Sequence, residues 1–540
     1  MSGLKRLPFT TRMEPRQDAA AATLFVGAAI LPVAALARLW GIHFSLPHPR
    51  CRPDEDAISA IAGGLRLADL NPHVFNYPAL FMLVVAIVLF MLPSLERLLH
   101  KAMPFHFRPL LDGASTTTIH YMVARVLTAA AGIASVWVVF RIALRLFDRT
   151  AALSAAALLA LAFLHVRDSH YGVTDVPMGF MVLIAFLYVV RFAESGVKRD
   201  VAIAGVTAGL AASTKYNAAL IALPALFAIF GSGPGTKSIR ARVADAATFV
   251  VLMVAAFVCT SPYSVLDFRH FSADVLSDAQ HLLGGHGVSV GRGWVYHATT
   301  TLRYGVGAPI LVAGVTGVLL LTIRNPRKGV LVALFPVSYY VLLGSGYTVF
   351  TRHMIPVVPF LCLTAGYFIA ESADWLAMRV RRPQWRAALV TLGVIGALWP
   401  SVRSVVMFDV LIARTDSRLL ARRWVEQRFP AGTTIAQIGP EAGHLFLHDV
   451  NEVSYTTIEF AREGPRPDIV VVQSSPLLPL PELGDMDHVL STDYTLRFGV
   501  EGAAPDPRNV YDLQDEFYLP FAGFHQIERP GPNLQVYVRR

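Results

Sequence analysis

Long runs of apolar residues constrain this chain more than any other feature. Most are roughly 18–22 residues long, the length that a helix needs to cross the hydrocarbon core of a membrane. Inside lipid, every backbone N–H and C=O must find a partner within its own segment, so we expect helices. Charged residues make up only 16% of the chain, against about 25% in soluble proteins. The sequence predicts eleven membrane-spanning helices, at about residues 20–40, 119–141, 150–166, 174–192, 200–214, 217–231, 244–263, 305–323, 328–345, 352–372 and 385–400.

Basic residues gather in the short turns between these runs. The net charge is +9, but basic residues in these positions are typical of the cytoplasmic turns of a membrane protein rather than of a nucleic-acid-binding face. One further apolar stretch, 79–93, is ambiguous. If it does not cross and the N-terminus is cytoplasmic, the Arg-rich turns face the cytoplasm and the short outer loops carry only Arg167, Lys215 and Arg352. We therefore expect a surface or re-entrant helix at 79–93, inside a long outer loop, 41–118. The first apolar run lacks the small-residue cleavage site of a signal peptide. We therefore expect it to remain uncleaved as a signal anchor in the membrane.

The chain beyond the last apolar run has the composition of a soluble protein. A helical pattern covers 417–428. Three runs with strand-like composition predict β-strands, at 433–438, 468–473 and 534–538. The expected fold is thus an α-helical polytopic membrane domain over 1–400, followed by a small extracytoplasmic α/β domain over 401–540.

Three consecutive acids follow a proline early in the first outer loop. Pro53 at a first helical position, with Asp54, Glu55 and Asp56 in the first turn, is typical of a helix start. One interpretation is therefore a capped amphipathic helix lying on the bilayer. The other is functional, because an ionised carboxylate at the membrane surface is what an acceptor hydroxyl needs as a general base.

The same loop contains a turn-rich segment, Asn71–Pro78. Its prolines and asparagines predict turns leading into the 79–93 helix. His73, Asn76 and Tyr77 are candidates to line a sugar or acceptor pocket, although a purely structural role is as plausible for each of them.

The second outer loop, 165–177, is dense in ionisable groups. It contains Arg167, Asp168, His170 and Asp175 beside an apolar span. Ionisable residues at membrane depth are costly and suggest function, while a solvated loop is the alternative. Asp and His can bind divalent ions, but this spacing is not diagnostic, so a metal stays an open question.

Cations on the predicted outer side run against the positive-inside pattern and need a reason. They are Lys215 beside Tyr216, Arg352 beside His353, and Arg125 about two turns into the second span. An anionic ligand such as a phosphate headgroup is one reason. Snorkelling of Arg125 to the interface is an alternative, as is an ion pair of Lys215 or Arg352 with Asp175 or Asp54.

Five segments, taken in order, resemble the bacterial members of the dolichyl-phosphate-mannose protein mannosyltransferase family. That family includes the aminoarabinose lipid A transferases and belongs to the GT-C glycosyltransferase superfamily. The likeness covers about residues 20–400. The segments are Pro-Asp-Glu at 53–55, Asn-Pro-His-Val-Phe-Asn-Tyr-Pro at 71–78, the 167–177 loop, Ser-Thr-Lys-Tyr-Asn at 213–217, and 352–360.

The resemblance implies an inverting transfer of a sugar from a polyprenyl-phosphate donor to a protein, lipid or glycan acceptor. It places the protein in the bacterial inner membrane. It implies no definite cofactor, and a weak dependence of the reaction on a divalent metal stays an open question. It makes Asp54 the proposed base, with Glu55 beside it, and maps the acid of the second loop onto Asp175. The sequence departs from the family pattern in two ways. Asp56 is an additional acid, so the assignment of the base among the acids of this turn is less definite. Ala57-Ile58 stands where the family often has an aromatic residue.

Two other classes of function remain to be weighed. A transporter or flippase would show inverted repeats and polar groups at mid-membrane, whereas the polar groups here gather at one face. A non-enzymatic scaffold is the other alternative, and it would tolerate the loss of Asp54.

Overall fold

The computed structural model describes residues 16–50, 52–66, 68–102, 115–232, 237–447, 456–457, 465–477, 485–515 and 517–540. The chain forms two compact units. The first, called the helical unit, comprises the chain up to Leu39 together with Leu65–Val84 and Val126–Val405. The second, called the mixed unit, comprises Trp40–Gly64, Val85–Arg125 and Val406–Arg540.

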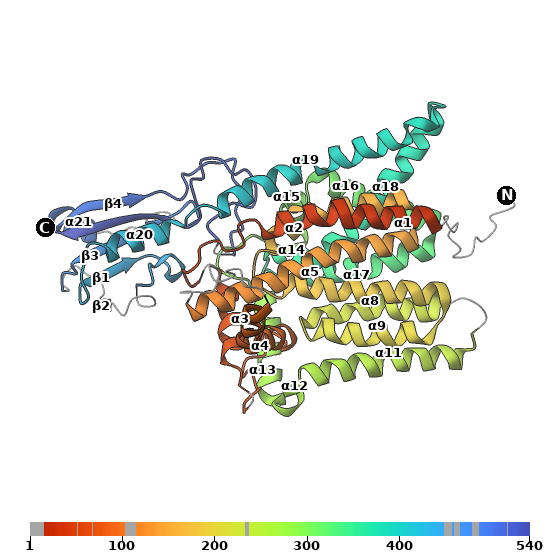
Figure 1. Ribbon diagram of the computed structural model, residues 1–540, viewed down its shortest axis with the longest axis horizontal. Coiled ribbons are helices and arrows are strands. Elements are labelled where there is room, and N and C mark those ends of the chain that lie inside the picture. Colours follow the sequence, from red (N-terminus) through yellow and green to blue (C-terminus); the bar gives the residue numbers. More distant parts are fainter. Residues whose placement is uncertain are drawn as a thin grey trace. The chain divides into compact units, whose positions relative to one another are not determined.

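Helices account for most of the chain (Figure 1). The elements up to α11 are α1 (Arg16–Phe25), η1 (Val26–Ile30), α2 (Leu31–Leu39), α3 (Pro53–Gly64), α4 (Leu80–Ala102), α5 (Thr116–Leu146), α6 (Arg149–Ala160), α7 (Phe163–Asp168), α8 (Asp175–Ser195), α9 (Lys198–Ala212), η3 (Tyr216–Ile221), α10 (Ala222–Phe227), η4 (Ala228–Ser232) and α11 (Ile239–Thr260). The later ones are α12 (Tyr263–Leu266), α13 (Phe268–Gly284), α14 (Gly293–Tyr296), η5 (His297–Leu302), α15 (Arg303–Gly305), α16 (Ala308–Arg324), α17 (Pro326–Gly344), η6 (Thr351–Val357), α18 (Val358–Arg379), η7 (Pro383–Trp385), α19 (Arg386–Ile412), α20 (Ser417–Glu426), η8 (Glu441–Gly443) and α21 (Asp485–Asp493).

Every predicted span falls on helical structure, and the prediction of a membrane protein is confirmed. Among the residues that the structure describes, seven helices are long and apolar enough to cross a membrane. The number rises to eight if Gly293–Gly305 and Ala308–Arg324, bent by 116°, form one broken span. The predicted spans at 150–166, 200–214 and 217–231 lie on shorter helices. Leu80–Ser94 is also a short apolar helix. The predicted number of eleven spans therefore stays a prediction.

Small residues allow the long helices of the helical unit to approach closely. α9 packs between α8 and α11 (Figure 1). α18 packs against both α6 and α16. A Cβ atom at Gly209 would collide with the carbonyl oxygen of Met253 on α11, and one at Gly317 with that of Thr364 on α18. Backbone approach of this kind is how helices gain packing contacts inside a membrane.

The Arg- and Lys-rich turns that the sequence assigns to the cytoplasm meet at one end of the helical unit. Four contacts connect them: Arg145 to Glu194 at 2.6 Å, Lys237 to the Gly196 carbonyl at 3.0 Å, Lys328 to the Leu146 carbonyl at 2.8 Å, and Arg386 to Asp148 at 2.8 Å. The helices leave these turns towards the end that carries Asp175 and Lys215. The grouping agrees with the predicted topology, while its orientation in the membrane stays a prediction.

The mixed unit contains a five-stranded sheet in the order β2-β1-β3-β5-β4. Its strands are β1 (Thr434–Ile438), β2 (Thr456–Thr457), β3 (Ile469–Ser474), β4 (Tyr494–Val500) and β5 (Asn533–Arg539). β1 pairs in parallel with β2 and β3, while β5 pairs antiparallel with β3 and β4. The strands predicted at 433–438, 468–473 and 534–538 and the helix predicted at 417–428 are confirmed.

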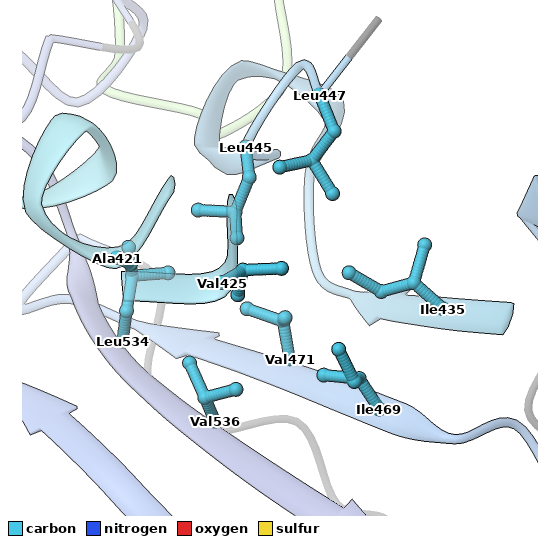
Figure 2. Close-up of a cluster of buried hydrophobic side chains, with 9 residues drawn as sticks. All are labelled: Ala421, Val425, Ile435, Leu445, Leu447, Ile469, Val471, Leu534 and Val536. Atoms are coloured by element: carbon cyan, nitrogen blue, oxygen red, sulfur yellow. The ribbon is translucent and has the colours of Figure 1, made fainter. Parts of the chain in front are cut away.

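A helix covers each face of this sheet, because side chains of successive strand residues point to opposite faces. Ile469 and Val471 face α20, whereas Val470 and Val472 face α21, so all four are buried. Figure 2 shows the cluster on the α20 side, formed by Ala421, Val425, Ile435, Leu445, Leu447, Ile469, Val471, Leu534 and Val536. The predicted small α/β domain is confirmed. Its predicted boundary at 400/401 stays a prediction, and α19 runs on through Pro400 to Ile412.

Candidate functional site

The first turn of α8 holds one of the predicted catalytic acids. Asp175 begins this helix, where the helix dipole favours a negative charge. Lys215 follows α9 in sequence, and its Nζ donates a hydrogen bond to Asp175 Oδ1 at 2.6 Å. The Asp175 side chain is 3% exposed and that of Lys215 is 19% exposed. The ion pair considered for Lys215 is therefore formed, and the lysine keeps part of its surface accessible.

η6 brings two more of the predicted donor-binding residues to this pair. Arg352 and His353 are each 9% exposed. The Arg352 guanidinium carbon lies 4.2 Å from the centroid of the Phe350 ring. The η6 segment packs against α8, the helix that begins at Asp175. The structure thus gathers cations and a histidine beside Asp175, as a site for an anion requires.

The second outer loop is built into the interior of the helical unit. Arg167, Asp168 and His170 are all buried. Arg167 donates to Thr351 Oγ1 of η6 at 3.1 Å and lies 3.5 Å from Asp168 Oδ2. His170 Nδ1 lies 3.0 Å from the Val166 carbonyl oxygen. The alternative of a solvated loop is therefore wrong for these residues, and Arg167 ties the loop to the segment that carries Arg352.

The segment Asn71–Pro78 lies against α13, a helix that we did not single out from the sequence. Three of its contacts are hydrogen bonds to acids: Asn71 Nδ2 to Asp267 at 3.1 Å, the Phe75 amide to Asp274 at 2.8 Å, and Asn76 Nδ2 to Asp278 at 2.7 Å. Burial raises the pKa of Asp278, and the hydrogen bond from Asn76 opposes that rise. The hydrogen bond from Asn71 lowers the pKa of Asp267.

Tyr216 joins this segment to the Lys215 turn. Its hydroxyl donates to the Phe75 carbonyl oxygen at 2.9 Å, and its ring lies 5.7 Å from that of Phe271. His73 is exposed and contacts Asp69 at 3.0 Å, while Tyr77 is half-buried. Asn76 and Tyr216 therefore position the loop beside Lys215, whereas His73 makes its side-chain contact at the surface.

In the mixed unit, the helix predicted at Pro53 is confirmed as α3, and two of its first-turn acids have clear partners. Glu55 is fully buried, and its carboxylate accepts from Arg125 Nε at 2.6 Å and from a terminal guanidinium nitrogen at 2.8 Å. The same guanidinium donates to the carbonyl oxygens of Ile42 and Phe44 at 2.8 and 2.9 Å. This geometry favours a structural role for Arg125 over the predicted phosphate contact.

The other two acids of this turn differ in exposure and contacts from Glu55. Asp56 accepts a hydrogen bond from the Tyr121 hydroxyl at 2.9 Å. Asp54 is half-buried in the first turn of α3, so its carboxylate is more accessible than that of Glu55. Arg52 anchors the start of the helix through an ion pair with Asp515. The assignment of Asp54 as the base stays a prediction.

Sequence reasoning missed the acids in and just before α13 and one histidine, His297. Asp267, Asp274 and Asp278 are spaced by seven and four residues, which places them on one helical face, and this was the signal available. His297, whose ring centroid lies 6.2 Å from that of His353, carried no signal in its surroundings. Within the described ranges, no group of three or more His, Cys, Asp or Glu side chains is arranged to hold a metal ion.

Comparisons with known proteins address the family and the fold. Residues 117–263 match the family model for dolichyl-phosphate-mannose-protein mannosyltransferase. This stretch includes Asp175 and Lys215. No curated protein sequence matches the chain.

Solved structures match over most of the chain at low sequence identity. ArnT from Cupriavidus metallidurans, solved bound to undecaprenyl phosphate, matches with a TM-score of 0.56 and 14% identity, covering 96% of this chain and 98% of that one. The archaeal oligosaccharyltransferase AglB from Archaeoglobus fulgidus, solved with an inhibitory peptide and a dolichol-phosphate, matches with a TM-score of 0.50 and 12% identity over 82% of this chain. The present chain spans 65% of the length of AglB.

The family match contains two of the five segments singled out in the sequence, 167–177 and 213–217. The helices carry the motifs in the expected places, and the small sheet domain follows them, as the fold prediction required. The family match and the shared fold of ArnT and AglB therefore confirm the resemblance to the protein mannosyltransferase and ArnT-like family of GT-C membrane glycosyltransferases.

Proposed function

We propose that this protein is a membrane glycosyltransferase that moves a sugar from a polyprenyl-phosphate-linked donor to an acceptor on the outer face of the bacterial inner membrane. The observation that carries the proposal is the group formed by Asp175 with Lys215 on one side and, on the other, η6 with Arg352 and His353, which packs against the helix that Asp175 begins. It combines cations with burial, which suits a phosphate at the edge of a membrane. The acceptor can be a protein, a lipid or a glycan.

In the proposed reaction, an acceptor hydroxyl oxygen attacks the anomeric carbon of the donor sugar. The bond between that carbon and the phosphate oxygen breaks, and the configuration at the carbon is inverted. Polyprenyl phosphate leaves with the bonding electron pair, and the hydroxyl proton passes to a carboxylate. Charge therefore develops on the phosphate as the bond breaks, and fixed cations lower the barrier most when they already face it.

The residues divide these tasks in the following way. Lys215 and Arg352 hold the phosphate, and Asp175 fixes the position of Lys215 through the 2.6 Å ion pair. Asp54 takes the acceptor proton, because its half-buried carboxylate is more accessible than that of Glu55. Glu55 and Arg125 hold the first turn of α3 in place.

A flippase for a lipid-linked or anionic substrate is the alternative. Such a protein would bind the same phosphate and move it without breaking the glycosidic bond. The polar groups of the helical unit favour an enzyme, because Asp175, Lys215 and Arg352 gather at one end rather than along a path.

The test is a transfer assay with the purified full-length protein in lipid nanodiscs. Undecaprenyl phosphate carrying a series of single sugars is supplied with a cell-envelope extract, and released undecaprenyl phosphate is measured by mass spectrometry. We expect release that depends on the acceptor and that is lost in Asp54→Asn. Transport of intact donor across proteoliposomes, with no release of undecaprenyl phosphate for any donor, would support the flippase instead.

A further inference from the structure

Three irregular helices lie in this part of the helical unit. η3, which begins after Lys215, and η6, which holds Arg352 and His353, are 3₁₀ helices, while η5 is a π-helix that begins at His297. η5 packs against η6, and α8 packs against both η3 and η6. Short π- and 3₁₀-segments within longer helices often mark functional sites, because they redirect side chains that a regular helix would place elsewhere.

His297 is a buried side chain with one ring nitrogen unused. Its side chain is completely buried, and its Nδ1 lies 3.1 Å from Thr301 Oγ1. Its Nε2 has no hydrogen-bond partner among the residues that the structure describes. His353, more than nine-tenths buried, likewise has an Nδ1 without a partner in the described ranges. The two ring centroids lie 6.2 Å apart.

Two such nitrogens on neighbouring rings need an explanation, because buried polar groups in native proteins are almost always hydrogen-bonded. Packing alone gives no reason to keep imidazoles here, since an apolar ring would fill the space without losing hydrogen bonds. Their position supplies a reason, because His353 follows Arg352 in η6, and η6 packs against α8, the helix whose Asp175 holds Lys215.

The chemistry of the pair suits a hydroxyl group better than a phosphate. Lys215 and Arg352 already provide positive charge for an anion. A neutral imidazole offers one donor and one acceptor, and a sugar hydroxyl is also both a donor and an acceptor. In a polyprenyl-phosphate donor, the sugar is bonded directly to the phosphate, so its hydroxyls come close to whatever surrounds the phosphate site.

We propose that His297 and His353 hydrogen-bond a hydroxyl group of the donor sugar and thereby help to select which sugar is transferred. This inference rests on the proposed function, and it assigns to His297 a specificity-determining role that the sequence motifs do not suggest. A site built to hydrogen-bond a hydroxyl discriminates strongly against a substrate that lacks it, because the buried partner is then left unsatisfied.

The test compares His297→Leu and His297→Gln with the wild-type protein in nanodiscs. Two quantities are measured: kcat/KM for the preferred undecaprenyl-phosphate sugar and for its monodeoxy analogues, and the Kd for undecaprenyl phosphate, which carries no sugar. We expect His297→Leu to lower kcat/KM for the full sugar about 10- to 100-fold and to lose the wild-type preference over one deoxy analogue. The Kd for undecaprenyl phosphate should stay within about twofold, and His297→Gln should recover part of the loss.

His286→Gln is the matched control. His286 is exposed and its ring lies 5.2 Å from that of Phe350, so the change alters a nearby imidazole away from the buried pair. We expect its kinetics and sugar preference to match the wild type. If His297→Leu does not fold, His353→Leu is measured in its place, with the same expected loss of sugar preference.

Two outcomes would overturn the inference while leaving the proposed function intact. One is an equal loss of undecaprenyl phosphate affinity and of transfer, which would place the contact on the phosphate. The other is unchanged kinetics and preference in the histidine variants, which would mean that water or packing satisfies these rings. A wild-type protein that transfers no sugar from any donor would instead remove the proposed function itself.

Discussion

Each unit of the molecule contains a buried carboxylate paired with a cation. The two cations differ in how many hydrogen-bond acceptors they already contact and in how much of their surface is exposed. In the mixed unit, the Arg125 guanidinium binds Glu55 and two carbonyl oxygens and lies 3.9 Å from the centroid of the Phe44 ring. In the helical unit, Lys215 donates to Asp175, its one hydrogen-bond partner in the described part of the chain, and remains 19% exposed. An ammonium group has three donors, so Lys215 can keep Asp175 and still receive a phosphate.

The difference teaches that charge alone does not identify a ligand-binding residue. Both cations stand on the predicted outer side, and both were candidates for the donor phosphate. A planar guanidinium with several fixed acceptors is a structural element, whereas a partly exposed ammonium with one anchor is available for binding.

Asp54→Asn should reduce turnover by about 10²–10⁴-fold, the usual worth of general acid–base catalysis. The half-buried Asp54 carboxylate is proposed to take the acceptor proton, so donor binding should survive. Steady-state transfer rates and binding of undecaprenyl phosphate measure the two effects separately. Asp56→Asn is the matched control and should be much milder, because Asp56 accepts a hydrogen bond from Tyr121. An inactive Asp56→Asn beside a largely active Asp54→Asn would move the base to Asp56.

Arg125→Ala should destabilise the folded protein by about 3–5 kcal/mol, because it leaves the Glu55 charge buried without its partner. Thermal unfolding in detergent, followed by tryptophan fluorescence, measures the change. Arg125→Ala with Glu55→Gln should recover part of the loss, since the buried charge is then absent. Wild-type stability with a weakened affinity for undecaprenyl phosphate would contradict the structural role and restore Arg125 as a donor anchor.

Acidification should weaken the mixed unit through His48. Burial lowers the pKa of His48 to about 3, and the nearby Arg418 adds to this effect. The neutral ring is therefore favoured in the folded state, so its contribution to stability is complete above the unfolded pKa of about 6.5 and is lost as the pH falls towards 3. Between pH 7.5 and pH 5 we expect a loss of about 2 kcal/mol in unfolding free energy. A wild-type pH profile no steeper than that of His48→Gln would contradict this assignment.

The fold followed from the sequence wherever local pattern and burial agree. The run from Ile469 to Val472 is apolar throughout because it is buried on both faces, and it was recognised as a strand. β4, Tyr494–Val500, was missed because most of its side chains are partly or fully exposed, so it shows little apolar alternation. The apolar spans were found by length, yet length cannot show where a helix bends, as between Gly305 and Ala308.

The candidate site could be predicted only as a set of residues and not as contacts. Local motifs located Asp175, Lys215 and Arg352, because ionisable groups are conspicuous beside apolar spans. They could not show that Glu55 meets a cation 70 residues away, nor that Asp278 holds Asn76. His297 could not be predicted because a single histidine followed by three threonines carries no pattern, and only the structure places its ring near that of His353.

The affinity of Lys215→Gln for undecaprenyl phosphate is the most direct test of the central claim, that the pair in the helical unit binds the donor. Lys237 supplies a close control, because it pairs with Asp245 at 2.7 Å and is 25% exposed, at the opposite end of the same unit. We expect Lys215→Gln to weaken binding by about 1.5–3 kcal/mol, the worth of a charge-assisted hydrogen bond, and Lys237→Gln to leave it unchanged. Equal affinities for the wild type and both variants, with all three folded, would contradict the claim.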